Sequence, residues 1–179
     1  MLHFHSNRPL IVGWLAGLVT AGIIAGVIGL LAFTGITFDT SASTPHPKLV
    51  GRAMHQTMVN SVRRRSGGLE PPEAAARASM LRGAIAYQRD CTVCHGGPGY
   101  ARARWVSAMQ PTPPYLLDTP NRWTHAELYK VIRDGVKMSG MPAWREVESP
   151  QTISDLTLFV ERLPKVSPQQ FARINQATR

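Results

Sequence analysis

The two cysteines of this 179-residue chain lie within one short stretch, Cys91-Thr92-Val93-Cys94-His95. Two residues between the cysteines let a single helical turn present both sulfurs to one edge of a planar ring. Each thiol can then add to one vinyl group of a porphyrin, and the next histidine lies under the ring, where it can bind iron. The stretch therefore predicts one haem c, covalently attached through Cys91 and Cys94, with His95 as an axial iron ligand.

Two other kinds of site also contain cysteines at this spacing, and each requires further features in the sequence. A structural zinc site normally has four Cys or His ligands, so a fourth would be needed here, for which His125 and His55 are candidates. A thioredoxin-like dithiol should follow a strand in a βαβ pattern. Residues 74–89, which precede Cys91, are instead rich in Ala, Arg and Leu and are typical of a helix.

The chain is basic, with 20 Lys and Arg against 11 Asp and Glu and a formal net charge of +9. The excess is densest in residues 44–69, which contain five basic side chains and no acidic one. Basic proteins often bind nucleic acid, but no nucleic-acid motif is present. We therefore expect no nucleic-acid partner.

Residues 10–33 form a run of 24 residues without a charged side chain. As a helix this run is about 36 Å long, enough to cross a hydrocarbon core of about 30 Å. It exceeds the apolar region of a signal peptide, which has ~7–15 residues, although the small residues at 41–43 resemble a cleavage site. We predict an uncleaved transmembrane signal anchor, preceded by a short N-terminal segment at residues 1–9.

Charge and haem chemistry predict opposite orientations for this anchor. Only Arg8 and the amino terminus are positive before the run, and the excess that follows would place the C-terminal side in the cytoplasm. In bacteria, however, haem is attached on the outer face of the cytoplasmic membrane. The prediction is a single-pass protein of the bacterial inner membrane, with residues 1–9 cytoplasmic and the haem domain in the periplasm.

Small residues recur every four positions within the predicted span: Gly13, Gly17, Ala21 and Ala25. Such spacing lets a second membrane helix approach closely, which predicts a helix–helix partner. The alternative is that glycine is simply common in membrane helices.

Residues 34–71 are predicted as a linker that contains a basic amphipathic helix at 48–65. Its apolar residues lie four apart: Val50, Met54, Met58 and Val62. Such a helix could lie on anionic lipid, pack on a partner subunit, or cover its own domain.

Residues 72–179 are predicted as the haem domain with a C-terminal tail. Helices are expected at 74–86 and at 152–163, and a third at 124–134. Thr124 and Glu127 have the spacing of a capping box at the start of that third helix.

The second axial ligand is predicted after the third helix. A thioether suits haem iron, and His/Met coordination raises the reduction potential. Met141 is favoured because Pro142 fixes the local φ and can aim a side chain from a loop. Met138, Met109 and His125 remain alternatives.

Three features together resemble class I c-type cytochromes: the Cys91–His95 motif, the pair Gly83 and Tyr87, and the run 140–144. The resemblance is to the membrane-anchored monohaem kind, similar to the small haem domains of C-type haem–copper oxidases, and it covers about residues 72–164. It implies a small all-α fold behind a single transmembrane helix. It also implies that helices near the two ends of the domain cross beside the haem, where Gly83 and Tyr87 would meet Leu156 and Phe159.

The resemblance further implies a set of residues around the haem. The carbonyl of Pro114 would accept a hydrogen bond from the second nitrogen of His95, and Leu116 would pack on the ring. Trp123 would donate its indole proton to a propionate, and Arg104 would offset propionate charge. Ordinary packing is the alternative for each.

With two axial protein ligands the iron has no open position, so we expect electron transfer and not catalysis. The expected function is a membrane-tethered monohaem cytochrome c that carries single electrons between respiratory-chain components. The alternative is a fixed cytochrome c subunit of a larger membrane oxidoreductase.

An acidic redox partner would be steered by basic residues near the distal ligand: Lys130, Arg133, Lys137 and Arg145. A haem enzyme or gas sensor would require a displaceable Met141.

Overall fold

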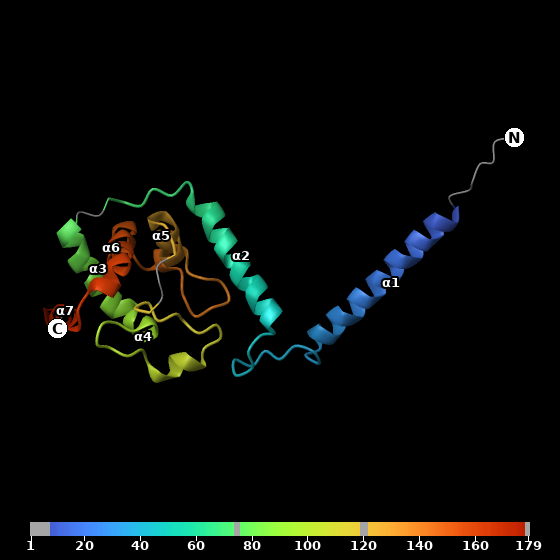
Figure 1. The fold of residues 1–179 in the computed structure, drawn as a ribbon, viewed down its shortest axis with the longest axis horizontal. Helices are drawn as coiled ribbons and strands as arrows, with labels where there is room; N and C mark the ends of the chain where they lie inside the picture. Colours follow the sequence, from blue (N-terminus) through green and yellow to red (C-terminus); the bar gives the residue numbers. More distant parts are fainter. Residues whose placement is uncertain (1–7, 74–75, 119–121, 178–179) are drawn as a thin grey trace. The chain divides into compact units, whose positions relative to one another are not determined.

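The computed structural model describes residues 8–73, 76–118 and 122–177. Every regular element in these ranges is a helix, and the one β-bridge is isolated, between Gly97 and Tyr100. The predicted all-α class is therefore confirmed (Figure 1). The chain divides into two units, Met1–Thr44 and Pro45–Arg179, and each is described by itself.

The first unit contains α1, Arg8–Phe33, which includes the whole predicted span. Its side chains are not buried, and the mean hydropathy of its most apolar window is 2.3. By length and composition α1 can cross a membrane, a property that a signal sequence near an N-terminus shares. Added Cβ atoms at Gly13 and Gly17 would meet nothing within 4 Å in this chain, so the close approach of a second helix is sterically open there.

The second unit begins with α2, Lys48–Ser66, within one residue of the prediction. This helix packs on α5, His125–Asp134, and buries Val62 and Ser66. Arg63 Nε also lies 3.8 Å from Glu127 Oε1. The boundary between the two units, after Thr44, lies within the predicted linker 34–71, and the C-terminal part of the apolar stripe of α2 is buried against the rest of the second unit.

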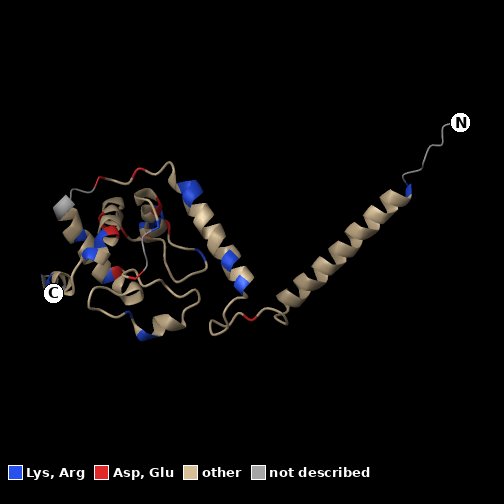
Figure 2. Cartoon of the chain, viewed as in Figure 1, with Lys and Arg blue, Asp and Glu red and all other residues tan. Residues whose placement is uncertain are grey.

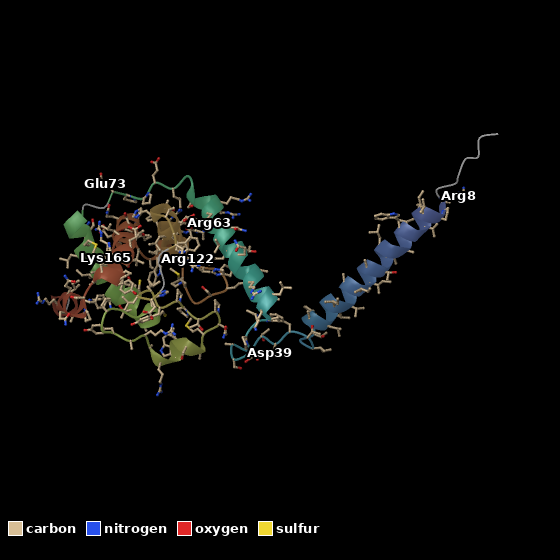
Figure 3. All side chains as sticks on the ribbon, viewed as in Figure 1. Arg8, Asp39, Arg63, Glu73, Arg122 and Lys165 are labelled. Carbon is tan, nitrogen blue, oxygen red and sulfur yellow. The ribbon has the colours of Figure 1, made fainter. Side chains whose placement is uncertain are left out.

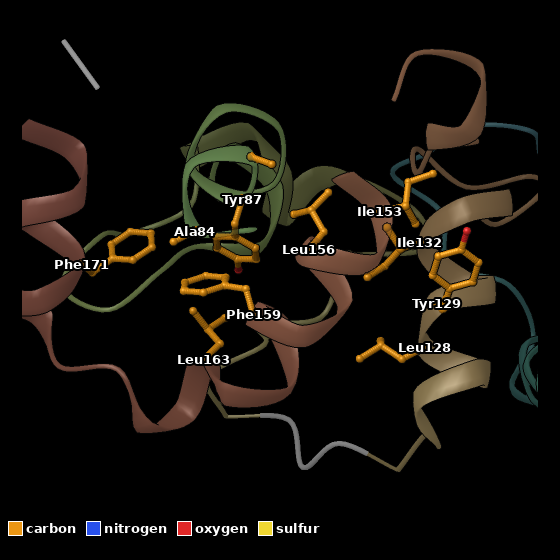
Figure 4. Packing of buried hydrophobic residues seen from close by; sticks show 11 residues of the cluster. Ala84, Tyr87, Leu128, Tyr129, Ile132, Ile153, Leu156, Phe159, Leu163 and Phe171 are labelled. Carbon is orange, nitrogen blue, oxygen red and sulfur yellow. The ribbon is translucent and has the colours of Figure 1, made fainter. Parts of the chain in front are cut away.

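The centre of the second unit is the crossing of α3, Ala76–Asp90, and α6, Pro150–Arg162. A Cβ at Gly83 would lie 2.1 Å from the carbonyl oxygen of Asp155 and 2.9 Å from Cβ of Phe159, so only glycine allows this approach. The rings of Tyr87 and Phe159 are 5.3 Å apart, and Leu156 is fully buried (Figure 4). The predicted helix crossing is therefore present, with Asp155 as an additional contact of Gly83.

An ion pair between the half-exposed Arg82 and the buried Asp155 adds to this crossing. The carboxylate of Asp155 is only 1% exposed, and it accepts hydrogen bonds from Arg82 Nε at 2.6 Å and from Gln151 at 3.1 Å. Burial alone would raise the pKa of Asp155, but the hydrogen bonds from Arg82, Ser79 and Gln151 outweigh it and lower that pKa. The carboxylate therefore stays charged in the folded protein.

Helix α5 begins and ends as predicted. Thr124 caps it through the backbone N–H of Glu127, and the Glu127 carboxylate accepts from the Thr124 N–H at 2.8 Å, which completes the capping box. Gly135, with φ of 64°, ends the helix. A Cβ at this glycine would also lie 2.3 Å from the carbonyl oxygen of Pro142, so the chain returns close to the helix end.

The predicted C-terminal tail is instead a helix, α7, Pro168–Ala177. Phe171 is 1% exposed, its ring lies 6.2 Å from that of Tyr87, and its carbonyl accepts a hydrogen bond from Gln88 at 2.8 Å. A Cβ at Gly97 would lie 2.7 Å from the Phe171 ring. This C-terminal segment packs on the core mainly through one buried aromatic side chain, and no long apolar pattern marks it in the sequence.

Candidate functional site

The predicted haem-attachment motif forms one helical turn directly after α3. Cys91 N–H donates to the carbonyl of Tyr87, and the turn α4, Thr92–His95, follows. The N–H groups of Cys94 and His95 both donate to the carbonyl of Cys91, at 3.1 and 2.9 Å. Both cysteines are free thiols. The backbone therefore gives the two sulfurs and the imidazole the arrangement that the motif chemistry requires.

His95 is held by the proline-rich segment. Its Nδ1 atom lies 2.8 Å from the carbonyl oxygen of Pro114, which can only accept, so Nδ1 carries the proton. This is the contact that the family resemblance implied, and it leaves Nε2 as the unprotonated nitrogen suited to bind iron. Burial lowers the pKa of His95, the Pro114 hydrogen bond opposes the shift, and the positive charge of Arg102 adds to it.

Two close contacts hold the proline-rich segment against the motif. Arg102 donates a hydrogen bond to the carbonyl of Pro113 at 2.7 Å. A Cβ at Gly96, where φ is 71°, would lie 2.1 Å from the ring of Tyr115. Arg104, the residue predicted to offset propionate charge, is exposed on the short helix η1, Arg104–Ala108. Sequence reasoning missed Arg102 because nothing in the spacing distinguishes these two arginines.

The thiol environment disfavours a redox-active dithiol. Burial raises the pKa of the Cys91 thiol to about 12, and the negative charge of Asp90 adds to the rise. Reactive cysteines need the opposite, a lowered pKa that yields thiolate. The motif also follows a helix, α3, and not the strand of a thioredoxin-like unit. Both observations favour thioether attachment over dithiol chemistry.

The zinc alternative lacks its ligands. Among the residues that the structure describes, no group of three or more His, Cys, Asp and Glu side chains lies close enough together to hold a metal ion. His125, a candidate fourth ligand, has its Nδ1 atom 3.0 Å from Glu161 Oε1. His55, the other candidate, is exposed on α2.

The structure separates the three methionines that were candidates for the distal ligand. Met141 is partly buried and packs against the hydrophobic core, whereas Met138 is 78% exposed and has a φ of 60°. Met109 lies against Gly140, because a Cβ added at this glycine would be only 2.1 Å from the Met109 Cε atom. Burial therefore favours Met141 over Met138 as the distal iron ligand. Met109 lies beside Gly140, the residue that precedes Met141.

The segment 135–142, called the distal loop below, is fixed by short-range contacts as well. Val136 N–H donates to the carbonyl of Met141 at 3.2 Å, and Met141 N–H donates to Ser139 Oγ at 3.2 Å. The close approach of Pro142 to Gly135 closes the loop. These contacts hold the Met141 backbone independently of any ligand.

Several partly buried side chains from separate parts of the chain pack against the hydrophobic core, and we call them the apolar set below. They include Cys91, Leu116, Leu117, Trp123, Met141 and Trp144. A haem is a planar, largely apolar group whose iron binds imidazole. It therefore matches a site with two thiols, an imidazole, a thioether and apolar side chains. Leu116 was predicted to pack on the haem ring and Trp123 to donate its indole proton to a propionate, whereas no role was predicted for Leu117. The described residues thus fit a haem c, and the fold and donors define a small all-helical c-type haem domain.

Comparison with known families agrees with this class. Residues 78–160 match the family described as cytochrome C oxidase, cbb3-type, subunit III. The match begins in α3 and ends in α6, so it includes the motif, the proline-rich segment and the distal loop. Neither the curated proteins nor the solved structures gave a match. The match over residues 78–160 therefore supports a c-type cytochrome domain of the cbb3 type, and with it a haem-containing electron-transfer cytochrome.

Proposed function

We propose that the protein is a membrane-tethered monohaem cytochrome c, which carries single electrons between respiratory-chain components on the periplasmic side of the membrane. The observation that carries this proposal is the hydrogen bond between His95 and Pro114, which leaves one imidazole nitrogen for iron directly beside two free thiols. The family match over the same residues supports it.

In this proposal Cys91 and Cys94 would hold one haem through thioether bonds, and His95 and Met141 would be the protein ligands of its iron. When bound, the haem supplies a one-electron Fe(III)/Fe(II) couple. The carbonyl of Pro114 keeps His95 in the ligating tautomer and orients its ring. Because two side chains of the protein would bind the iron, little room would be left there for a substrate, which favours electron transfer over catalysis.

The surrounding residues would tune this couple. Leu116 and the other side chains of the apolar set would limit contact of the haem with water, and a thioether ligand would favour the reduced iron, so both would raise the reduction potential. Trp123 and Arg104 are proposed as partners of the propionates. Arg102 is a second candidate for this role, because its positive charge acts on His95.

The charges near the distal loop determine how strongly this part of the domain attracts an acidic redox partner. Asp134 pairs with three of the four basic residues named for this role: with Lys130, with Arg133 at 3.7 Å and with Arg145 at 3.1 Å. Burial would raise the pKa of Asp134, but the hydrogen bond from Lys130 and the neighbouring cations lower it, so the carboxylate stays charged. We therefore propose weaker steering of an acidic partner than four solvated cations would give, with the exposed Lys137, which is not among the partners of Asp134, as its main contributor.

The anchor restricts where electrons are delivered. If α1 crosses the membrane, the haem domain searches for partners only near the membrane surface, at a raised effective concentration. The second candidate function, a fixed subunit of a larger oxidoreductase, is favoured by the description of the matched family as an oxidase subunit. The open small-residue face of α1 at Gly13 and Gly17 would then receive a partner helix.

Extraction in mild detergent distinguishes these two functions. A free shuttle should elute as a monomer with one haem per chain by haem extraction and protein quantification. A fixed subunit should co-elute at constant stoichiometry with other membrane proteins. Absence of covalent haem from the purified chain would contradict both.

A further inference from the structure

The two halves of α2 differ in what covers their apolar side chains. In the C-terminal half Val62 is buried, and Arg63, which is labelled in Figure 3, reaches Glu127 of α5. In the N-terminal half Leu49 is 79% exposed, and Val50 and Met54 are each 39% exposed. The same stripe that docks one end of α2 on the haem domain thus continues as an apolar surface that the domain leaves exposed.

The charges of α2 have one sign. The helix contains five basic residues and no acidic one, so Figure 2 shows blue segments and no red along it. Lys48 and Arg52 flank the exposed apolar end, and both are exposed themselves. Apolar side chains bordered by cations are the composition of helices that lie in the headgroup region of anionic membranes.

The position of this surface in the chain limits its distance from the anchor. The 14 residues between Phe33 and Lys48 can span at most about 50 Å when fully extended. The segment is shorter than that, because Asp39 accepts hydrogen bonds from Ser41 N–H at 2.8 Å and from Thr44 Oγ1 at 2.6 Å. The exposed end of α2 therefore stays within reach of the membrane surface that α1 would enter.

We propose that the N-terminal end of α2 docks on anionic lipid headgroups of the membrane that α1 crosses. Leu49, Val50 and Met54 enter the interface between headgroups and acyl chains, while Lys48 and Arg52 contact lipid phosphates. Docking holds the haem domain at the membrane surface and limits its rotation on the tether. The proposal rests on the membrane anchor of the proposed function.

Hydrogen exchange of the full-length haem protein in lipid nanodiscs tests this docking. The discs contain either phosphatidylcholine alone or phosphatidylcholine with phosphatidylglycerol. Backbone amides of residues 48–56 should exchange several-fold more slowly in the anionic discs, and high salt should abolish the difference. Amides of α6 serve as an internal reference, because the core of the domain is the same in both discs.

Two charge-reversal variants sharpen the experiment. Lys48→Glu with Arg52→Glu should remove the slow exchange in anionic discs. Lys165→Glu with Arg173→Glu makes the same change of net charge at exposed positions outside α2 and should leave the slow exchange intact. An unchanged haem spectrum verifies that both variants fold.

The outcomes separate docking from anchoring. Equal exchange of residues 48–56 in the two kinds of disc, with the chain stably inserted, overturns the docking proposal and leaves the anchor standing. Protection of these residues only in a native protein complex would also overturn the docking proposal, because a protein and not lipid would then cover the exposed end of α2. A chain that does not stay in either disc contradicts the anchor itself.

Discussion

Glycines allow other parts of the chain to approach closely both where α3 crosses α6 and in the distal loop. The atoms that approach differ between the two places. Gly83 meets the rigid backbone of Asp155, whereas Gly140 meets the terminal methyl group of Met109, which can move. The crossing therefore tolerates almost no change, while the distal loop is adjustable at Gly140. The proposed cytochrome would use both properties, because the crossing positions the attachment motif and the loop would supply the second iron ligand.

The largest expected effect comes from Gly83→Leu. The added side chain cannot fit between α3 and α6 without moving backbone, so the free energy of unfolding should fall by about 3 kcal/mol or more. Thermal unfolding of the haem-loaded protein measures this. Gly67→Ala is the matched control, since a Cβ there meets nothing within 4 Å and φ is −64°. If Gly83→Leu unfolds at the wild-type temperature, the crossing is not as tight as described.

The next largest effect is expected for Phe171→Ala, which tests whether α7 belongs to the same core as the crossing. The ring is fully buried near Tyr87, so its loss should destabilise the fold by about 3–5 kcal/mol. Urea unfolding followed by circular dichroism is suitable. Ile174→Ala, at a partly buried position, should cost less. Equal, small losses for both would mean that α7 is only loosely attached.

The ion pair at the crossing should produce a pH dependence. The pKa of Asp155 is lowered from 3.8, so the pair stabilises the fold above that pH, and the stability is lost as pH falls through the folded-state value. Asp155→Asn should cost about 1–2 kcal/mol at neutral pH, a modest figure because Arg82 is half-exposed. It should also flatten the fall in stability below about pH 4. An unchanged acid profile in urea titrations would show that other carboxylates control it.

The smallest effects on stability are expected in the distal loop. Gly140→Ala displaces only the methyl end of Met109 and should cost about 1 kcal/mol. Gly135→Ala should cost more, since it combines a φ of 64° with a contact to the Pro142 backbone. Both should weaken the far-red sulfur-to-iron absorption band more than they lower the unfolding temperature. The opposite ranking would indicate that the loop does not position Met141.

Local patterns account for what the sequence could predict. The attachment motif, the capping box of Thr124 and Glu127, and the small residue Gly83 each carry their information within a few positions. The hydrogen bond from His95 to Pro114 was accessible only through family resemblance, because 19 residues separate the partners. In each of these cases a short stretch or a known family specifies the contact.

Contacts between distant segments account for what was missed. Helix α7 depends on one aromatic side chain that meets α3, and Arg102 differs from Arg104 only in the segment it faces. The choice between Met138 and Met141 rested on a neighbouring proline, whereas the structure distinguishes them by burial. Such differences depend on the assembled fold, so periodicity and spacing do not reveal them.

The central claim is that one haem c is held by Cys91 and Cys94 between His95 and Met141. The most direct test is the visible spectrum of the purified full-length protein and of two methionine variants, oxidised and reduced. The account predicts a c-type spectrum with the far-red sulfur-to-iron band, retained in Met138→Ala and lost in Met141→Ala. A haem spectrum without that band, or loss of the band in Met138→Ala alone, would contradict the ligand assignment. A purified chain without covalent haem would contradict the account as a whole.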